Sequence, residues 1–277
     1  MNAETLTLTQ KADFIRKKLV DLAVKNGAEH IAPSLSTVDI LTALYYSILN
    51  IPDPNSPDWE DRDRFVLSKG HGCYGFYAIL HDLGIIPDFE WENFHLGGSS
   101  LTGCVERNPK YGLEAGCGSL GHGLPIAVGI ALGAKLQGKK FKVYCMVGDG
   151  EMQEGSMWEA VQFAAKHKLD NLTVIVDNNG LQAMDFLENI LTKTNEENDL
   201  RNKLSAFGFK AVNCNGHSIN EVEKILKSWN GDGASELPKA LIAKTTKGYG
   251  LLCMENVPKF HYRMPTQEEL RMGNRYE

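Results

Sequence analysis

Acidic and amide side chains follow two apolar runs of the chain, at the point where each run ends. The first run, 142–147, stops at Gly148-Asp149-Gly150, and the second, 172–176, stops at Asp177-Asn178-Asn179. Between them, the spacing of small and apolar residues over 156–168 predicts a helix. Strand, turn, helix and strand form a βαβ unit, whose two parallel strands end at the same edge of the sheet.

The side chains of Asp149 and Asn179 are expected to meet at that edge, because open α/β sheets bind ligands beyond the carboxyl ends of their strands. A carboxylate and an amide oxygen suit a hard octahedral cation that keeps phosphate oxygens as its other ligands. The pattern therefore predicts a magnesium diphosphate site. Gly-Asp-Gly alone also fits an ordinary strand-to-helix turn in which Asp149 caps the helix, and the asparagines after the second strand favour the ligand site.

The run GDGEMQEGS, residues 148–156, resembles the diphosphate-binding motif of thiamine diphosphate enzymes. It is similar to transketolases in particular, including the separately encoded N-terminal transketolase subunit of many prokaryotes. The resemblance extends over about residues 10–270, and Ser68-Lys69-Gly70-His71 is its next most specific part. It implies an α/β fold of three layers, with a mostly parallel central sheet and helices on both faces. Residues 1–277 would form a single diphosphate-binding domain.

The resemblance also implies which residues contact the cofactor. Asp149, Asn179 and the backbone carbonyl of Leu181 would bind Mg²⁺, for which Ca²⁺ or Mn²⁺ could substitute. Glu154 matches a glutamate at the family's subunit interface that links paired active sites. The residues implied for thiamine diphosphate itself are Gly148, Asp149, Gly150, Glu151, Asn179, His71, Gly118, Ser119, Leu120 and Lys244.

Four histidines are candidates for moving protons and binding substrate oxygens, because imidazole titrates near neutral pH. By resemblance, His30 faces the substrate near the thiazolium, and His71 lies beside the diphosphate and the substrate channel. His261 matches a histidine near the cofactor's amino group. His122 stands where transketolases carry a glutamine in a glycine-rich loop. From the sequence alone, His30 and His261 also fit surface positions, and His71 also fits a helix cap.

One position departs from the family pattern in a way that concerns the substrate. Transketolases carry a Gly-His-Pro segment whose histidine helps to bind sugar hydroxyls. The nearest segment here is Thr102-Gly103-Cys104-Val105. Cys104 therefore stands where the substrate-binding histidine is expected, which weakens the expectation of ordinary pentose-pathway sugar phosphates.

Further elements are expected from apolar periodicity, caps and glycines. A first helix is capped by Thr7 or Thr9 and ends at Asn26-Gly27, and a connection then leads to a second helix that begins at Ser36. The second helix extends to Ile48. The other expected strands are 64–68, 209–213 and 240–244, and the other expected helices are 74–83, a helix that begins at Pro125 and includes Ala134, and 218–229.

Composition limits the classes of function. With 277 residues, 43% of them hydrophobic, the chain can bury a substantial core. The net charge of −6 without a basic cluster argues against nucleic acid as a partner. No apolar run reaches membrane-spanning length, and the first residues do not resemble a signal peptide. The six cysteines contain no C-x-x-C pair, so we expect reduced thiols in a cytoplasmic protein.

The resemblance implies half of an enzyme. A two-carbon ketol unit would pass from a ketose or ketose phosphate donor to an aldose acceptor through thiamine diphosphate. The pyrimidine-binding domain, with the glutamate that activates the cofactor, and the C-terminal domain are expected on a partner chain. That partner would be the C-terminal transketolase subunit, with two copies of each chain in a heterotetramer.

Other functions remain open at this point. One is a thiamine diphosphate enzyme that uses pyruvate, either 1-deoxyxylulose-5-phosphate synthase-like or acyl-transferring. The alpha subunit of a 2-oxo-acid dehydrogenase is disfavoured, because Gln153-Glu154-Gly155 stands where Asn-Gln-Gly is typical. A non-catalytic subunit that keeps the fold is opposed by the presence of Asp149, Asn179, His30 and His71. A dinucleotide-binding domain is least favoured, because no Gly-x-Gly-x-x-Gly follows an early strand.

Overall fold

A computed structural model describes residues 6–53, 55–191, 199–230 and 236–271. Over these residues, five parallel strands form one sheet in the order β1-β2-β3-β5-β4. All the expected strands are present, with ends shifted by at most two residues. They are β1 (Arg64–Leu67), β2 (Val143–Gly148), β3 (Leu172–Asn178), β4 (Lys210–Asn215) and β5 (Lys239–Lys244).

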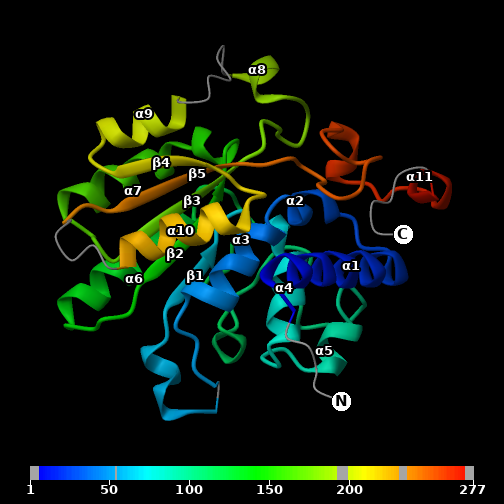
Figure 1. Cartoon of the computed structure of the whole chain (residues 1–277), viewed down its shortest axis with the longest axis horizontal. Coiled ribbons are helices and arrows are strands. Elements are labelled where there is room, and N and C mark those ends of the chain that lie inside the picture. Colours follow the sequence, from blue (N-terminus) through cyan, green and yellow to red (C-terminus); the bar gives the residue numbers. More distant parts are fainter. Residues whose placement is uncertain (1–5, 54, 192–198, 231–235, 272–277) are drawn as a thin grey trace.

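Helices cover both faces of this sheet (Figure 1). On one face, α6 (Gly123–Leu136) packs against β1, β2 and β3, and α7 (Gly155–Lys166) packs beside α6. On the other face, α10 (Ile219–Asn230) packs against β4 and against α3 (Val38–Ala43). Parallel strands are joined by right-handed crossovers, so the direction of a connection across the sheet decides which face its helix covers. The connection from β4 to β5 runs in the direction opposite to that from β2 to β3. The helix α10 therefore lies on the face opposite α7. The expected three-layer fold is confirmed.

The first helix, α1 (Leu8–Asn26), follows its sequence signals closely. Thr7 is the N-cap and forms a capping box with Gln10, and Gly27 ends the helix at a φ of 69°. The remaining helices, several of which are short, lie in the segments around the sheet. They are α2 (Ile31–Leu35), η1 (Leu44–Ile48), η2 (Pro57–Asp61), η3 (Gly70–Gly72), α4 (Cys73–Asp82), α5 (Asp88–Glu92), η4 (Pro109–Tyr111), η5 (Glu151–Gln153), α8 (Leu187–Ile190), α9 (Asp199–Ala206), η6 (Pro258–His261) and α11 (Gln267–Arg271).

The segment 27–48 differs from the expectation of a connection followed by one helix. The expected connection contains the fully buried helix α2, and the expected second helix is divided into α3 and the π-helix η1. The reason lies in Ser36. Its hydroxyl does not cap α3 but donates to the Asp177 carboxylate at 2.8 Å, which joins this segment to the end of β3.

One buried apolar core joins the sheet to the helices on both of its faces. The strands β1, β2, β3 and β5 are buried almost along their whole length, as expected for parallel strands covered on both faces. Within the part of the chain that the structure describes, no helix has both the length and the apolar character that crossing a bilayer requires.

Candidate functional site

A cavity of about 450 Å³ lies beyond the carboxyl ends of β1, β2 and β3. Most of the residues predicted from the sequence line it, although they come from six separate stretches of the chain. These are His30, His71, Gly118, Leu120, Gly148, Asp149, Gly150, Glu151, Glu154, Asn179, Leu181 and His261.

Asp149 and the segment after β3 meet in this cavity. The Asp149 carboxylate accepts from the Gly180 amide at 2.5 Å and from the Gly150 amide at 2.8 Å. It therefore reaches the backbone between Asn179 and Leu181. The Asn179 amide is fixed in turn, because its oxygen accepts from the Leu181 amide and its nitrogen donates to Asp177, both at 3.0 Å.

This set of groups fits a hard cation that shares its coordination with an anionic ligand. Burial, and then the nearby carboxylate of Asp177, raises the pKa of Asp149 to about 6, so a cation would favour its ionised form. In the described ranges, no three His, Cys, Asp or Glu side chains gather as a metal cluster. The protein thus offers one carboxylate, one amide oxygen and backbone carbonyls, and a bound ligand has to supply other oxygens.

A buried ion pair at the wall of the cavity joins the ends of β1 and β3. The Lys69 ammonium contacts the Asp177 carboxylate and donates to the Pro33 carbonyl at 2.9 Å. The Thr245 hydroxyl also donates to Asp177. Although burial opposes ionisation, Lys69 and the hydroxyl donors hold the pKa of Asp177 below its usual value. Sequence reasoning noted the segments that contain Lys69 and Asp177 but did not pair them, because 108 residues separate the two.

Three of the predicted histidines form a cluster on one wall of the cavity. The ring centroids of His30 and His71 are 6.2 Å apart, and that of His261 lies 5.7 Å from His30 and 5.1 Å from His71. Burial lowers the pKa of all three, to about 3 for His261. The three imidazoles are therefore neutral at physiological pH. Tyr262, which sequence reasoning missed, adds a ring 5.6 Å from His30 and 4.5 Å from His261.

Lys247 is a further residue of the site that sequence reasoning did not select. Its buried ammonium donates to the Gln182 carbonyl at 3.0 Å and lies 2.6 Å from Nδ1 of His261. Burial, and then Lys69, lowers the pKa of Lys247 to about 7. No carboxylate in the described ranges forms an ion pair with this ammonium. The carboxylates of Asp149 and Asp177 are near enough to favour its charged form but form no direct ion pair with it. A buried ammonium without a direct ion pair suits an anionic ligand such as a diphosphate.

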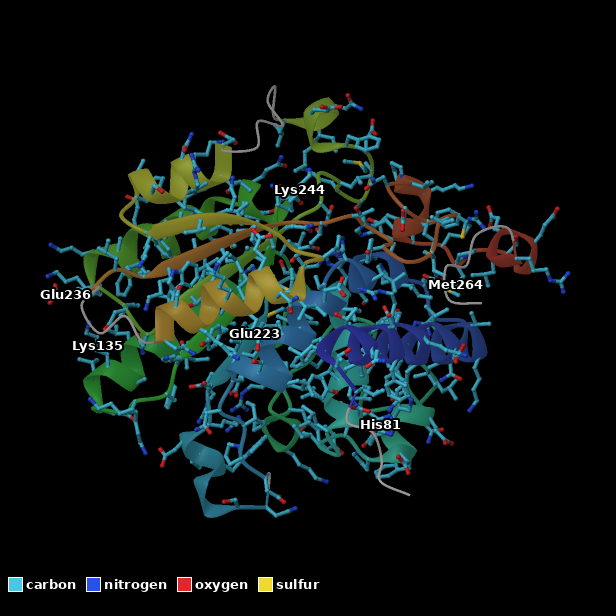
Figure 2. The ribbon with its side chains drawn as sticks, viewed as in Figure 1. His81, Lys135, Glu223, Glu236, Lys244 and Met264 are labelled. Atoms are coloured by element: carbon cyan, nitrogen blue, oxygen red, sulfur yellow. The ribbon has the colours of Figure 1, made fainter. Side chains whose placement is uncertain are left out.

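Lys247 corrects the prediction for Lys244. Lys244, which is labelled in Figure 2, is the last residue of β5 and is exposed. It lines a different cavity together with His217. Side chains alternate along a strand, so the last residue of β5 points away, and the chain must turn before a lysine can reach the site. The Lys247-Gly248 pair, part of the same tail, is the sequence signal for the lysine that lines the cavity.

Two other predicted residues also lie outside the cavity. Ser119 is exposed. His122 is exposed at the N-terminus of α6, where its Nδ1 lies 3.0 Å from the Leu120 carbonyl, and it lines a groove between α6 and α7. His122 therefore does not join the histidine cluster, because the glycine loop turns its side chain toward the outside.

Glu151 lines the cavity, but its carboxylate is bonded to the protein. It accepts from the Gly121 amide at 2.9 Å, from the Gly148 amide at 3.1 Å and from the Ser68 hydroxyl. It therefore links the glycine loop to the ends of β1 and β2. Glu154 is exposed at the rim, and half-buried Cys104 forms part of the cavity wall.

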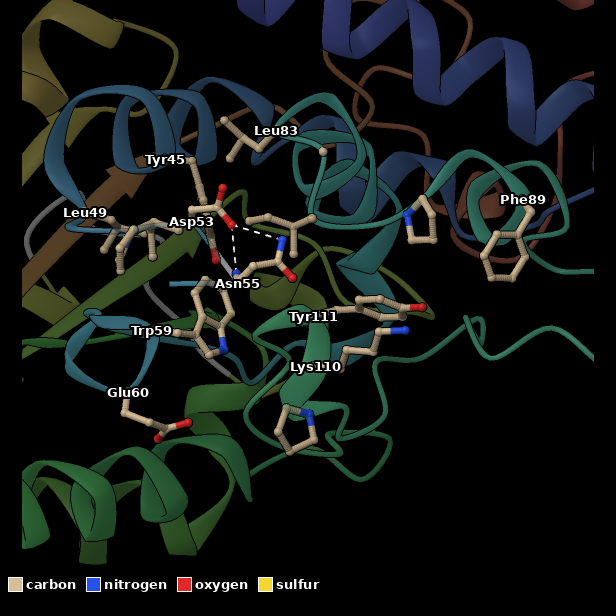
Figure 3. A pocket seen from close by; sticks show the side chains of 16 residues that line it. Tyr45, Leu49, Asp53, Asn55, Trp59, Glu60, Leu83, Phe89, Lys110 and Tyr111 are labelled. Atoms are coloured by element: carbon tan, nitrogen blue, oxygen red, sulfur yellow. Dashed lines mark hydrogen bonds between the residues drawn. The ribbon is translucent and has the colours of Figure 1, made fainter. Parts of the chain in front are cut away.

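A larger cavity of about 830 Å³ lies elsewhere and contains none of the predicted site residues (Figure 3). Aromatic rings of Tyr45, Trp59 and Tyr111 line it, and Asp53 accepts from the Asn55 amide at 2.7 Å. Its polar groups do not converge on a common point as those around Asp149 do. Convergent polar groups with shifted pKa values, rather than volume, identify the functional cavity.

Comparison with known proteins agrees with this geometry. Residues 8–272 match the family described as transketolase, thiamine diphosphate binding domain. An apulose-4-phosphate transketolase subunit of Actinobacillus succinogenes is 40% identical over 96% of this chain and 94% of its own length. The 6-deoxy-6-sulfo-D-fructose transketolase subunit SqwG of a Clostridium species is 32% identical over 97% of this chain and 95% of its own length.

Solved structures of transketolases have the same fold. The transketolase of Leishmania mexicana superimposes with a TM-score of 0.86 at 28% identity, over 96% of this chain. That of Campylobacter jejuni superimposes with a TM-score of 0.83 at 31% identity, over 97% of this chain. This chain spans only 40% and 42% of the length of those two proteins. The chain therefore belongs to the transketolase family, as a thiamine diphosphate-binding N-terminal subunit of a transketolase-like transferase.

Proposed function

We propose that this chain, together with a partner subunit, transfers a two-carbon ketol unit from a ketose phosphate donor to an aldose acceptor. One observation carries the proposal. Asp149 after β2 and the Asn179–Leu181 segment after β3 converge on a single cavity, and that cavity also contains the buried ammonium of Lys247 and three neutral histidines.

Asp149, Asn179 and the Leu181 carbonyl would hold Mg²⁺, with Ca²⁺ or Mn²⁺ able to substitute, and Lys247 would neutralise the diphosphate. When bound, thiamine diphosphate supplies the electron sink that carbon–carbon cleavage requires. The protein contributes binding, orientation and exclusion of water. Glu151 supports this indirectly, because it fixes the glycine loop that contains Gly118 and Leu120.

The neutral histidines would bind substrate oxygens and hold protons. Lys247 occupies Nδ1 of His261, so Nε2 carries the proton of the neutral ring and can donate it to a substrate oxygen. His30 and His71 face the same space and can accept protons from substrate hydroxyls. Cys104 completes the wall with a thiol, whose pKa is raised by burial, so it offers no negative charge to the substrate.

The residues 1–277 are proposed to form one diphosphate-binding domain. Three relatives that align over most of their own length are themselves named as subunits of transketolases, which supports a partner chain. We propose that this partner carries the pyrimidine-binding domain and its glutamate, that two copies of each chain assemble, and that Glu154 lies where the paired sites meet. The cytoplasmic location stays a prediction.

The names of the relatives and the composition of the cavity support a proposal for the substrate class. The two relatives described above are named for a sugar phosphate and for a sulfonated sugar, which supports a ketose donor with an anionic group. Cys104 in the wall favours a donor other than an ordinary pentose-pathway sugar. Turnover of ketose phosphates, sulfonated ketoses and pyruvate by the assembled enzyme distinguishes these donors, and turnover of pyruvate alone would contradict the proposal.

The test of the site is calorimetric titration of the full chain with thiamine diphosphate and Mg²⁺. Asp149→Asn removes the charge of the proposed carboxylate ligand and should weaken binding by about 100-fold or more. Asp61→Asn is the matched control, because Asp61 is 60% exposed and pairs with Lys139 on the surface. Equal affinity of wild type and Asp149→Asn, with unchanged thermal stability, would refute the assignment.

A further inference from the structure

The backbone that carries Lys247 is fixed by a chain of hydrogen bonds outside the cavity. The Thr246 amide, directly before Lys247, lies 2.8 Å from Nε2 of His217. Nδ1 of His217 lies 2.8 Å from the Asp39 carboxylate, which is also 2.7 Å from the Arg16 guanidinium. The side chains of Arg16, Asp39 and His217 are only 1%, 7% and 11% exposed.

The direction of these bonds fixes the tautomer of His217. A backbone amide can only donate, so Nε2 of His217 accepts and carries no proton. In the neutral ring the proton is then on Nδ1, from which it is donated to Asp39. Arg16 holds the Asp39 carboxylate in place as the acceptor. The chain Arg16–Asp39–His217 thus presents one acceptor of defined position to the segment after β5.

Packing leaves little freedom between the turn that contains His217 and this segment. Tyr249 stacks on the His217 ring with centroids 3.6 Å apart and planes 17° apart, and the Arg16 guanidinium lies 5.0 Å from the Tyr249 ring. A Cβ on Gly216 would lie 2.5 Å from the Thr245 side chain and 3.1 Å from the Lys244 carbonyl. The close approach at Gly216 brings His217 within reach of Thr246.

Two backbone hydrogen bonds also hold the segment that contains Lys247. The Gly248 amide donates to the Ala32 carbonyl at 3.1 Å, and the Lys247 carbonyl accepts from the Asn256 amide at 2.9 Å. The bond from the Thr246 amide to His217 adds a side-chain contact directly before Lys247. Its loss would let this turn shift, and a displacement of about 1 Å at a catalytic site is enough to reduce function strongly.

We propose that His217 is a positioning residue for Lys247, held in its acceptor tautomer by Asp39 and Arg16. His217 lies outside the cofactor cavity, and its hydrogen bond to this segment is to the backbone of Thr246. The inference rests on the proposed function, in which Lys247 binds the diphosphate. It assigns to the buried Arg16–Asp39–His217 chain a part in cofactor binding in addition to its part in packing.

Two substitutions separate positioning from packing. In His217→Gln, the amide oxygen can replace Nε2 as acceptor for Thr246. In His217→Asn, the shorter side chain can reach Asp39 but not Thr246. Calorimetry of the full chain with thiamine diphosphate and Mg²⁺ should show about tenfold weaker binding for His217→Asn and near wild-type binding for His217→Gln. In the background of Lys247→Met, the effect of His217→Asn should disappear, because the two residues act as one unit.

Amide hydrogen exchange of the full chain without cofactor gives an independent measurement. The amides of residues 246–250 should exchange faster in His217→Asn than in wild type, and His217→Gln should restore protection. Unchanged exchange in His217→Asn overturns the inference whatever the calorimetry shows. The inference is also overturned if wild type and His217→Asn bind the cofactor with equal affinity, or if His217→Asn and His217→Gln lose affinity equally. It is likewise overturned if His217→Asn still weakens binding in the Lys247→Met background. A wild-type chain that binds no cofactor overturns the proposed function instead.

Discussion

At the scale of single residues, Asp149 and Lys247 present opposite charges to one cavity, and burial opposes the charged form of each. The pKa of Asp149 is raised to about 6 and that of Lys247 is lowered to about 7. Each group is then close to losing its charge near neutral pH. A bound cation would stabilise the carboxylate and a bound diphosphate would stabilise the ammonium, so the two charges favour binding of both together.

Affinity for thiamine diphosphate with Mg²⁺ should therefore depend on pH in two directions. Below about pH 6 Asp149 gains a proton and loses its charge as a metal ligand, and above about pH 7 Lys247 loses its proton and its charge. Binding should be tightest between these values and weaken by up to about tenfold one unit beyond each. Calorimetry between pH 5 and about pH 8.5 measures this profile.

Lys247→Met is the control for this profile. It should weaken binding at neutral pH and remove the fall on the alkaline side, while the acid side persists because Asp149 is intact. Ionisation of the free cofactor affects both chains equally and cancels in the comparison. An alkaline fall of the same size in Lys247→Met would show that another group causes it.

At the scale of elements, α6 joins the glycine loop to the sheet by a close approach at its first residue. A Cβ on Gly123 would lie 2.5 Å from the Cα of Ser68, directly after β1. Further along the same helix, a Cβ on Gly133 would meet no atom within 4 Å. At Gly123 the absence of a side chain thus allows α6 to pack closely against the end of β1. At Gly133 no contact requires glycine, which there only lowers the stability of the helix.

Alanine substitutions at these two positions should have opposite effects on stability. Gly123→Ala forces a backbone shift between α6 and β1 and should lower the free energy of unfolding by about 1–3 kcal/mol. Gly133→Ala raises helix propensity and should increase it by about 0.5–1 kcal/mol. Urea unfolding of the full chain measures both. Destabilisation of equal size at both positions would mean that the contact at Ser68 is not what requires glycine.

Sequence reasoning performed differently for regular elements and for the segments between them. The five strands and α1 were predicted to within two residues, because apolar runs, caps and glycines mark them locally. The division of 27–48 into α2, α3 and η1 was not predicted, because it depends on the bond between Ser36 and Asp177, which are 141 residues apart. The sequence does not separate Lys244 from Lys247 for a similar reason, because the direction of a side chain after β5 depends on the turn that follows.

At the scale of the whole molecule, the match to the transketolase family confirms the expected family, fold and reaction class. The cavity opens at one edge of the sheet, and exposed apolar side chains contribute to its lining, among them Leu191 and Tyr262. A surface of this kind is compatible with the proposal that a partner chain completes the site.

The purified chain should bind thiamine diphosphate with Mg²⁺ but show no turnover of ketose donors without its partner. Adding the C-terminal subunit should restore transfer of the two-carbon unit to an aldose, as measured by the aldose product released. The same partner mixed with Asp149→Asn serves as the control and should remain inactive. Full activity of the isolated chain would contradict the split arrangement.

The sequence by itself determined the strands, the βαβ unit around Gly148-Asp149-Gly150 and the candidates Asp149, Asn179, His30, His71 and His261. These are local signals, since strand ends and glycine turns are encoded within a few residues. Only the tertiary structure decided that Lys69 pairs with Asp177, that Lys247 rather than Lys244 enters the cavity, and that His122 faces away. Those outcomes depend on contacts between distant segments and on the direction of each side chain, which the packing of the three layers sets.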